Sequence, residues 1–476
     1  MDKHFPGAQP GLRYFLTLDF ALFSAIIGSM ADQQPNLLEK IVSLAKRRGF
    51  VFPGSEIYGG LANSWDYGPL GVELKNNIKQ LWWKRFVQQR DDMVGIDAAL
   101  IMNPKVWEAS GHLAGFSDPL IECKKCHNRI RADQADQLES LASRAIVIGG
   151  KPTCPADGKQ HEWTEPKQFN LMLKTFLGPA EEKANIVYFR PETAQAMFVD
   201  FKNILDTSRK TIPFGVAQIG KAFRNEITPG NFIFRTREFE QMEVEYFIKP
   251  ENWEKHFEEW RVEMQNWMQE IGLDMSKVHE HEIEESERAF YSKRTIDFEF
   301  EYPFGQKELY GLAYRTNYDL TQHQNASGKE LKYRDPETNE EFVPHVIEPS
   351  LGVDRTLLVV LLSAYTEDGD RVFLKLKPKL APYKAAVFPL LRNKPELVAK
   401  AKEIYDNLRK EFMVAWDDRG NIGKRYYSQD EIGTPYCITV DFDTLEKGTV
   451  TVRDRDTAKQ ETISADELAS FIKSKI

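Results

Sequence analysis

The segment from residue 223 to residue 243 constrains the fold of this chain more than any other part of the sequence. Its first stretch, 223–226, and its last, 235–243, both alternate as β-strands do. Between them stands Thr228-Pro229-Gly230-Asn231, a run of residues that favour tight turns. The segment therefore predicts an antiparallel β-hairpin.

The alternation also predicts which side chains share a face of each strand. Arg224 and Glu226 are expected on one face of the first strand. Arg235, Phe239 and Glu243 are expected on one face of the second. If these faces coincide, the hairpin presents guanidinium groups for phosphates, a ring for a base, and carboxylates for an ammonium group or a metal. The hairpin is then a nucleotide platform; the alternative is an exposed hairpin whose charges form salt bridges.

The composition is that of a globular protein with no general affinity for nucleic acid. With 476 residues the chain is long enough for two or three domains, and its 42% hydrophobic and 28% charged residues are ordinary values. Because the formal net charge is −9, any RNA contact must depend on local basic surface. The four cysteines fit a reducing compartment, so we expect a cytoplasmic location and no disulfide scaffold.

The beginning of the chain is unusual. Residues 14–27 are largely apolar and follow basic residues, as in a signal peptide. Asp19 interrupts this run, however, and the run is too short to cross a bilayer comfortably. A polar linker and an amphipathic helix follow Met30. We therefore expect translation to begin at Met30, which would make residues 1–29 a non-native extension.

A long helix is predicted from about Val72 to Gln88, after a glycine-rich loop. Its large apolar side chains recur at helical spacing and form one stripe. The stripe consists of Leu74, Ile78, Leu81, Trp82 and Phe86. It can be an ordinary core face or the contact surface of a dimer, because both need one apolar side.

Residues 104–165 are expected to form an insertion that carries most of the cysteines. Cys123 and Cys126 form a Cys-x-x-Cys pair, which is half of a zinc knuckle, and Cys154 stands where the second half would be. A structural zinc site needs four ligands. The candidates for the fourth are His127, Asp157 and His161. The alternative to a bound zinc is a turn that has lost its metal.

Two further segments present charged residues at predicted helix starts. Glu192 follows Pro191, where a carboxylate can either cap the helix or be presented to a ligand on a fixed loop. Gly352 and Arg355 precede an apolar helix, whose first N–H groups favour anions. For Arg355 the alternative is a buried pair with Asp354 that caps the helix.

The last part of the chain, from 381 to 476, alternates between strand-like and helix-like stretches. This pattern predicts a small α/β domain. Residues 419–426 are expected to be a polar loop within it, and residues 279–288, earlier in the chain, a charged and solvated run.

In order along the chain, these segments resemble the three motifs of the class II aminoacyl-tRNA synthetases. Residues 223–243 match an aromatic-Arg-x-Glu, a loop and an Arg-x-x-x-Phe-x-x-x-Glu, and the helix at 72–88 has the place of the first motif. Residues 348–355 read Glu-Pro-Ser-x-Gly-x-Asp-Arg. This third pattern is similar to that of the glycyl-tRNA synthetases of the homodimeric (α2) type.

The resemblance implies an α+β fold, with a class II antiparallel sheet flanked by helices and a C-terminal α/β anticodon-binding domain. It implies a catalytic domain at 30–380, with insertions near 104–165 and 251–295, and an anticodon-binding domain at 381–476. The implied partners are tRNA(Gly), glycine, ATP and a second copy of the chain, bound through the region of the first motif. No membrane is expected.

By this resemblance the protein attaches glycine to the 3′ end of tRNA(Gly), using ATP with Mg²⁺, through a glycyl-adenylate. Arg224 and Arg355 are the implied catalytic residues, on the α- and γ-phosphates. Phe239 would stack on adenine, and Glu308, with Glu240 as a second candidate, would hold magnesium. The full set implied for ATP is Arg224, Asn225, Glu226, Phe234, Arg235, Thr236, Arg237, Glu238, Phe239, Glu308, Leu309, Gly352, Val353, Asp354 and Arg355.

Glycine offers no side chain to grip, so its site must bind the ammonium group and exclude anything larger. The resemblance implies Glu192, Glu243 and Glu348 for the ammonium, with Ser350 narrowing the pocket. The other residues implied around glycine are Arg131, Phe239, Glu240, Gln241, Met242, Pro349, Leu351 and Gly352.

Two other functions are weighed against this one. A synthetase-like RNA-binding or regulatory protein without catalysis would have lost the motif arginines or the acidic set, and both are present here. A class II synthetase for proline, threonine or serine is a second alternative. The three glutamates and the Glu-Pro-Ser-x-Gly pattern argue against it.

Overall fold

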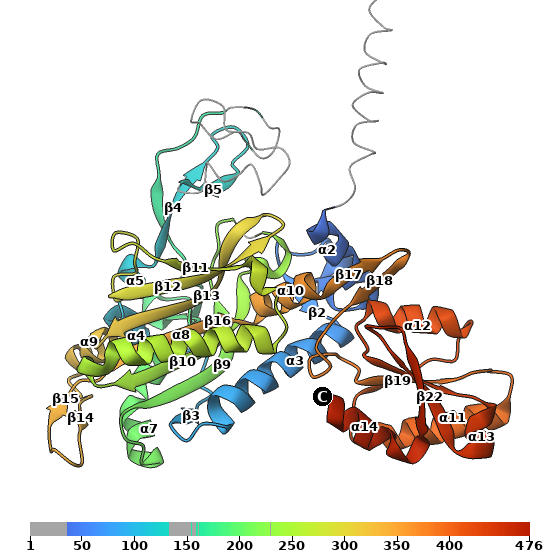
Figure 1. The fold of residues 1–476 in the computed structure, drawn as a ribbon. Helices are drawn as coiled ribbons and strands as arrows, with labels where there is room; N and C mark the ends of the chain where they lie inside the picture. The colour runs from blue at the N-terminus through green and yellow to red at the C-terminus, as the bar shows by residue number, and fades with distance from the viewer. Residues whose placement is uncertain (1–35, 133–153, 155–158, 160, 229) are drawn as a thin grey trace, which may run out of the picture.

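The computed structural model describes residues 36–476, except 133–153, 155–158, 160 and 229 (Figure 1). The expected extension at residues 1–29 lies outside the described residues, as does Asp157. In the described part of the chain, no helix combines the length and the apolar character that crossing a bilayer requires.

A large sheet lies in the middle of the molecule and carries the predicted hairpin. In the described residues it has seven strands in the order β11-β12-β13-β16-β10-β9-β3, all paired antiparallel except β3 with β9. Their bounds are β3 Met93–Gly95, β9 Phe214–Phe223, β10 Glu238–Ile248, β11 Val278–Glu282, β12 Arg294–Tyr302, β13 Gly305–Thr316 and β16 His345–Gly352. The edge strand β11 takes up the start of the charged run at 279–288, whose residues are all exposed or half-buried, as expected.

Helices cover one face of this sheet and form the main core with it. The principal ones are α2 Leu37–Arg48, α3 Pro69–Trp83 with a π-helical continuation Lys84–Gln88, α8 Trp253–Glu270 and α10 Val353–Ala364. On β10 the even-numbered side chains Met242, Val244 and Tyr246 point into this core. The odd-numbered side chains therefore point to the opposite face, which carries the cavities described below.

The apolar stripe of the 72–88 segment belongs to this core. Leu74, Ile78, Trp82 and Phe86 are buried within the chain itself and pack with residues of α8 and α10. The helix begins at Pro69, earlier than the predicted Val72, because proline fits the first helical position. Of the two interpretations of the stripe, the core face is correct for these four side chains.

Smaller elements complete the first part of the chain. A second core lies around α6 Ala194–Val199 and α7 Phe201–Ser208, against β9, β10 and α9 Tyr318–Ser327. The insertion holds α4 Pro104–Ala109 and α5 His112–Gly115, with a small sheet of β4 Ser117–Glu122, β5 Arg129–Arg131 and β6 Lys167–Asn170. Figure 1 shows β4 and β5 projecting from the body of the molecule. Two-stranded pairs are β1 Val51–Pro53 with β2 Trp65–Tyr67, β7 Lys174–Phe176 with β8 Ile186–Tyr188, β14 Tyr333–Arg334 with β15 Glu341–Phe342, and β17 Tyr365–Asp368 with β18 Arg371–Leu374.

The C-terminal part forms a separate sheet with its own core (Figure 1). Its order is β20-β19-β21-β22-β23, with parallel pairing of β19 to both β20 and β21. The strands are β19 Ala385–Pro389, β20 Val414–Trp416, β21 Tyr436–Val440, β22 Thr449–Asp454 and β23 Gln460–Ser464. The helices are α11 Pro395–Leu408, α12 Ile422–Glu431, α13 Phe442–Lys447 and α14 Leu468–Lys475. The predicted α+β architecture, an antiparallel sheet flanked by helices and followed by an α/β unit, is confirmed.

One local prediction in this unit is wrong. The expected polar loop at 419–426 becomes helical at Ile422, because the Asn421 side chain accepts a hydrogen bond from the Lys424 N–H and caps α12.

The hairpin of β9 and β10 is confirmed, but its strands are shorter than alternation predicts. β9 ends at Phe223 and β10 begins at Glu238, so Arg224, Glu226 and Arg235 lie on the connection. There Asn231 and Phe232 have positive φ angles of 55° and 59°, and a short 3₁₀ helix follows. Buried aromatic side chains in that helix anchor the loop, so period-two alternation does not apply to it.

Candidate active site

Two adjoining cavities open on the face of the large sheet opposite α3, α8 and α10. The first, here called the arginine cavity, is lined by Arg224, Glu226, Ile233, Phe234, Arg235, Thr236, Phe239, Glu240, Gln241, Glu308, Leu309, Ser350, Gly352, Asp354 and Arg355. The second, the acidic cavity, includes Glu192, Glu243, Tyr291, Asp297 and Glu348 in its lining. Both are also lined by Arg224, Gln241, Glu308 and Ser350, so the two cavities meet at these four residues.

Arg224 lies at the junction, immediately after β9. Its Nε donates a hydrogen bond of 3.1 Å to the Pro191 carbonyl oxygen, which leaves the end of the guanidinium group facing the cavities. The guanidinium carbon lies 5.2 Å from the ring centroid of Phe239 and 5.3 Å from that of Phe116. Arg224 is therefore held in place by its stem and by two rings, with its remaining donors available to a ligand.

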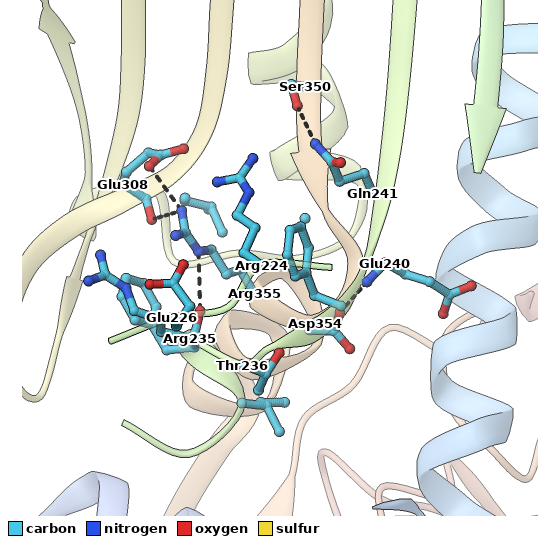
Figure 2. Close-up of a pocket in the computed structure, with 15 residues that line it drawn as sticks. Arg224, Glu226, Arg235, Thr236, Glu240, Gln241, Glu308, Ser350, Asp354 and Arg355 are labelled. Atoms are coloured by element: carbon cyan, nitrogen blue, oxygen red, sulfur yellow. Dashed lines mark hydrogen bonds and ion pairs between the residues drawn. The ribbon is translucent and has the colours of Figure 1, made fainter. Parts of the chain in front are cut away.

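Arg355 approaches the same cavity from the first turn of α10 (Figure 2). Its Nη1 lies 3.1 Å from Glu308 Oε2, and its guanidinium carbon lies 4.5 Å from the Phe234 ring centroid. The positive charge of Arg355 holds the pKa of Glu308 below its usual range. The alternative interpretation, a pair of Arg355 with Asp354, is wrong, because Asp354 instead accepts hydrogen bonds from Lys75 Nζ at 2.9 Å and from the Glu240 N–H at 2.7 Å.

Arg235 adds a third guanidinium group to this cavity, and burial lowers its pKa. Facing the three arginines are the carboxylates of Glu226 and Glu308. Glu226 is buried, and its Oε2 has no hydrogen-bond partner among the described residues. A buried acceptor without a partner is costly, so this oxygen is suited to a donor group of a ligand.

Glu240 does not join this set. Figure 2 shows its carboxylate turned away from Arg224 and Arg355. It forms ion pairs with Lys75 at 2.8 Å and Lys79 at 3.1 Å, which lower its pKa against the opposing effect of burial. Glu240 lies two residues before Met242 on β10, so its side chain points to the same face of the sheet, toward the helices. It therefore does not lie beside Glu308, as a second magnesium ligand would have to.

The acidic cavity is built around Glu243, a fully buried carboxylate on β10. Its Oε1 accepts hydrogen bonds from Ser350 Oγ at 2.8 Å and Gln241 Nε2 at 3.2 Å, and its Oε2 accepts one from the Thr193 hydroxyl. Burial and the nearby charge of Glu192 raise its pKa. Three donors therefore fix the orientation of this carboxylate.

Glu192 is buried beside it and does not cap the following helix. Its Oε1 accepts a hydrogen bond of 2.9 Å from Gln195 Nε2, and its Oε2 lies 3.5 Å from His112 Nε2. Burial opposes ionisation here, but His112 and Arg315 hold the pKa of Glu192 well below its usual range. The helix begins after Thr193 without a side-chain cap, so the presented-carboxylate interpretation fits this geometry better than the capping one.

Arg315 is a buried residue of this site that the sequence reasoning missed. Its Nη1 lies 2.6 Å from Glu348 Oε1, and its other nitrogen atoms bind Asp319 at 2.8 and 2.9 Å. Its side chain is only 1% exposed. No local pattern singles out Arg315, because only the pairing of β13 with β16 brings it to Glu348.

The charges of the acidic cluster do not balance within the chain. Glu192, Glu243, Glu348 and Asp319 are all buried, and among the described residues Arg315 is the one arginine or lysine that forms ion pairs with members of this group. Burial among like charges raises the pKa of Glu348 to about 8, despite Arg315. A small cation placed in this cavity would compensate the excess negative charge.

The other residues implied by the resemblance lie elsewhere. The side chains of Met242 and Leu351 point into the main core, and Val353 is buried with them. Pro349 lies two residues before Leu351 on β16, on the same face of the strand, and lines neither cavity. Arg237 binds the carbonyl oxygens of Ala62 and Glu226, and Glu238 pairs with Lys221. The side chain of Asn225 is not among those lining the cavities.

Arg131, Cys123, Cys126 and Cys154 belong to the insertion. Arg131 lies on β5 and forms an ion pair of 2.6 Å with Asp118. It lines neither cavity, but its positive charge contributes to the lowered pKa of Arg235. The three cysteines lie together, outside both cavities.

Comparisons with known proteins agree with this architecture. Residues 178–364 match the model of the "tRNA synthetase class II core domain (G, H, P, S and T)", and residues 384–475 match that of the "Anticodon binding domain". The chain is 53% identical over 459 residues to the glycine–tRNA ligase of Clostridium tetani, covering 92% of this chain and 98% of that protein. This chain belongs to the glycine–tRNA ligase family.

Two further members show the same extent of similarity. The glycine–tRNA ligase of Geobacillus thermodenitrificans is 52% identical over 465 residues, covering 94% of this chain and 99% of that protein. That of Alkaliphilus oremlandii is 52% identical over 458 residues, covering 92% and 98%. The family therefore extends through both the class II core and the C-terminal unit, as the resemblance of the sequence motifs implied.

Proposed function

We propose that this chain attaches glycine to the 3′ end of tRNA(Gly), using ATP and passing through a glycyl-adenylate. Membership of the glycine–tRNA ligase family supports the reaction. The observation that carries the residue assignments is the junction of the two cavities: a buried cluster with excess negative charge adjoins a cavity with three arginines, and Arg224 lines both.

In the first step the acidic cavity binds the ammonium group of glycine through Glu192, Glu243 and Glu348. The amino acid is then oriented with its carboxylate toward Arg224, where it meets the α-phosphate of ATP. A carboxylate oxygen forms a bond to that phosphorus, the bond to the bridging oxygen breaks, and pyrophosphate leaves with the electron pair. Arg355 and Arg235 balance the charge of the departing phosphates, so the protein contributes position and electrostatic stabilisation.

Phe239 and Glu226 support the placement of the adenine base. The ring of Phe239 stands beside Arg224 and offers a face for stacking. The unpartnered Glu226 Oε2 is an acceptor for the exocyclic amino group of the base. In the second step the 3′-terminal hydroxyl of the tRNA attacks the carbonyl carbon of the adenylate, and AMP leaves.

The carboxylates beside Arg355 fit a magnesium ion bound with ATP. Glu308 faces the arginine cavity, and burial together with the charges of Glu308 and Glu299 raises the pKa of Asp297 to about 7. Such a group of hard oxygen donors near phosphates suits Mg²⁺. When bound, the ion would neutralise phosphate charge, and Glu308 would be its protein ligand. Arg355 holds the Glu308 carboxylate in position for that role.

Selection of glycine is assigned to the crowding around Glu243. Ser350 and Thr193 both donate hydrogen bonds to its carboxylate, so the α-carbon of an amino acid whose ammonium group binds Glu243 would lie against these two side chains. A larger amino acid would have to displace these hydrogen-bonded groups. We expect such overpacking to cost about 1–3 kcal/mol for the first extra methyl group.

We further propose a homodimer formed near the start of α3, and a cytoplasmic location. The loop before α3 exposes Ile57, Tyr58 and Leu61 at 88%, 86% and 68%, an apolar group that a second copy of the chain would cover. All four cysteines are free thiols, which suits a reducing compartment. Light scattering of the wild-type chain and of Ile57→Glu tests the dimer; a monomeric wild-type chain would contradict it.

The reaction is tested by amino-acid-dependent exchange of pyrophosphate into ATP, with glycine, alanine, serine, threonine and proline compared. We expect exchange with glycine alone. Exchange with another of these amino acids would overturn the specificity but keep the reaction class. A folded chain that binds ATP or tRNA and shows no exchange would instead support the non-catalytic alternative.

A further inference from the structure

The insertion brings together three cysteines and one histidine that the proposed reaction does not use. Cys126 Sγ lies 2.9 Å from Cys154 Sγ, and Cys123 Sγ lies 3.2 Å from His161 Nδ1. The four donor atoms all lie within 4.8 Å of one another. In a tetrahedral zinc site with Zn–S bonds of about 2.3 Å, the sulfur atoms are roughly 3.8 Å apart. The cluster therefore has the donor set of a zinc site, and its four atoms lie close enough to surround one ion once the Cys126 and Cys154 sulfur atoms move apart to that distance.

The backbone holds this cluster in place on both sides. At the Cys-x-x-Cys turn the Cys123 N–H donates to the Asn128 carbonyl oxygen at 2.8 Å, and the His127 N–H donates to the Cys123 carbonyl oxygen at 2.9 Å. The second side is tied to the first by the Lys124 N–H, which donates to the Glu162 carbonyl oxygen at 2.9 Å. These bonds fix the two halves of the cluster against each other.

The structure also decides between the candidates for a fourth ligand. His161 is within the cluster, whereas the His127 side chain is 74% exposed and its Nδ1 lies 2.9 Å from Glu122 Oε1. Asp157 is outside the described residues. Cys123 and Cys154 are both fully buried, so two of the four ligands are shielded from water. Among the described residues, His161 completes a Cys₃His set.

The part of the insertion around β4 and β5 has little else to stabilise it. Its own hydrophobic cluster contains only Ile121 and Ile130 as buried members among the described residues, with Ala132 and Trp163 packed against them. A small unit with so few buried apolar side chains usually needs a metal or a disulfide. A disulfide between Cys126 and Cys154 is disfavoured, because it would leave Cys123 and His161, which lie in the same group, without a partner for their donor atoms.

We propose that Cys123, Cys126, Cys154 and His161 bind one Zn²⁺ ion in a closed structural site. The metal would hold the small sheet of β4, β5 and β6 in one arrangement, because three thiolates and one imidazole fill a tetrahedral coordination shell. Arg131 lies on β5 of this sheet and acts on Arg235 of the arginine cavity through its charge. The zinc site would thus hold the strand that carries Arg131, without contacting the substrates.

The first test measures the metal content of the purified full-length chain by mass spectrometry, under reducing conditions. We expect about one zinc per chain, retained through dialysis, and its loss from His161→Ala and Cys126→Ser. Cys437→Ser is the matched control, because Cys437 is a buried cysteine of the C-terminal sheet and its replacement should leave the zinc in place. A wild-type chain that holds no zinc after incubation with Zn²⁺ and reductant would overturn the proposal.

Cobalt substitution identifies the ligands without relying on the fold of a variant. Co²⁺ bound to the zinc-free wild-type chain should show the visible absorption of a tetrahedral thiolate site, with an additional charge-transfer band in the near ultraviolet. A pink octahedral spectrum, or an intact mass lower by two hydrogens from a Cys126–Cys154 disulfide in the isolated protein, would contradict it.

The structural role has its own readout. Removal of zinc with a chelator should accelerate proteolytic cleavage within residues 104–165 several-fold, while the C-terminal unit is cleaved at an unchanged rate. Equal cleavage of the insertion with and without the metal would show that zinc does not stabilise it. None of these measurements depends on aminoacylation, so they stand apart from the test of the proposed function.

Discussion

Glu243 and Ser350 face each other across the neighbouring strands β10 and β16, and the Ser350 hydroxyl donates a hydrogen bond of 2.8 Å to Glu243 Oε1. The pair joins two motifs separated by 107 residues in the chain. It fixes a buried carboxylate whose second oxygen is held by Thr193. Much of the proposed chemistry of the acidic cavity depends on this one relationship.

Replacement of Glu243 by glutamine should weaken glycine binding and leave ATP binding nearly intact. The change removes the negative charge but keeps the size of the side chain, and a hydrogen bond to a charged group is worth about 1.5–3 kcal/mol. We expect the KM for glycine in pyrophosphate exchange to rise by about 10- to 100-fold. Equal losses for glycine and ATP would contradict the ammonium role.

Glu245→Gln is a matched control on the same strand. Glu245 is fully buried, lines neither cavity, and has no hydrogen-bond partner for either carboxylate oxygen among the described residues. Burial and the charge of Glu348 raise its pKa well above the usual value, which favours the neutral acid, and this form is close to glutamine in charge and shape. The KM for glycine should therefore change less than about twofold.

Ser350→Gly should relax the selection against alanine. The substitution removes the hydroxymethyl group that contacts Glu243 and opens space next to the bound α-carbon. A difference of one methyl-sized group is worth about 1–3 kcal/mol in such pockets. We expect the ratio of kcat/KM for alanine to that for glycine to rise by about tenfold or more; Gln306→Gly, an exposed position on β13, should leave it unchanged.

Glycine binding should release a proton at neutral pH. Burial among other carboxylates raises the pKa of Glu348 to about 8 from an ordinary value of 4.5, so in the free protein it carries a proton at pH 7. A bound ammonium group favours the charged carboxylate and expels that proton. The affinity for glycine should accordingly rise with pH, by up to about tenfold per pH unit, and level off above about pH 8.

Calorimetry in buffers of different ionisation enthalpy measures this proton release. Glu348→Gln should abolish it, and a pH-independent affinity in the wild-type chain would contradict the prediction.

The raised pKa of Glu348 also makes the free energy of unfolding depend on pH. Between about pH 4.5 and 8 the folded chain binds a proton at this site that the unfolded chain does not, so its contribution to the free energy of unfolding falls as pH rises.

Arg355 and Arg224 should be separable by kinetics. Arg355 lines only the arginine cavity, so Arg355→Lys should raise the KM for ATP, by roughly tenfold, with little effect on the KM for glycine. Arg224 lines both cavities, so Arg224→Lys should lower kcat and weaken both substrates. Identical profiles for the two variants would contradict the assignment of Arg224 to the junction.

Asp430 should be important for stability rather than for catalysis. It is fully buried on α12 and binds Arg453 at 2.8 and 3.0 Å and Arg371 of β18 at 2.7 Å, which ties the C-terminal unit to the first part of the chain. Asp430→Asn leaves the buried guanidinium group of Arg453 and the half-buried one of Arg371 without this counter-charge and should lower the free energy of unfolding by about 3–5 kcal/mol.

Urea unfolding followed by circular dichroism measures this loss. The control is Asp443→Asn, which removes an exposed ion pair with Lys447 and should change stability by less than about 1 kcal/mol. Similar losses for both variants would show that burial does not set the cost.

The fold class, the hairpin, the core helix and the order of the motifs could all be predicted from the sequence. Apolar periodicity placed Leu74, Ile78 and Trp82 on one buried face, because a helix that packs on a sheet needs such a stripe. Alternation likewise separated Glu243 from Met242, because strand geometry sends neighbouring side chains to opposite faces.

Which charged groups meet could not be predicted, because it depends on contacts between segments that are distant in the chain. Arg315 reaches Glu348 because β13 pairs with β16, and ion pairs with Lys75 and Lys79 of α3 hold the Glu240 carboxylate away from the arginines of the arginine cavity. The loop at 224–237 departs from strand alternation because its buried aromatic residues, not its hydrogen-bond ladder, fix its path. Local periodicity determines the face on which a side chain lies, whereas contacts between distant segments determine the charge environment in which it acts.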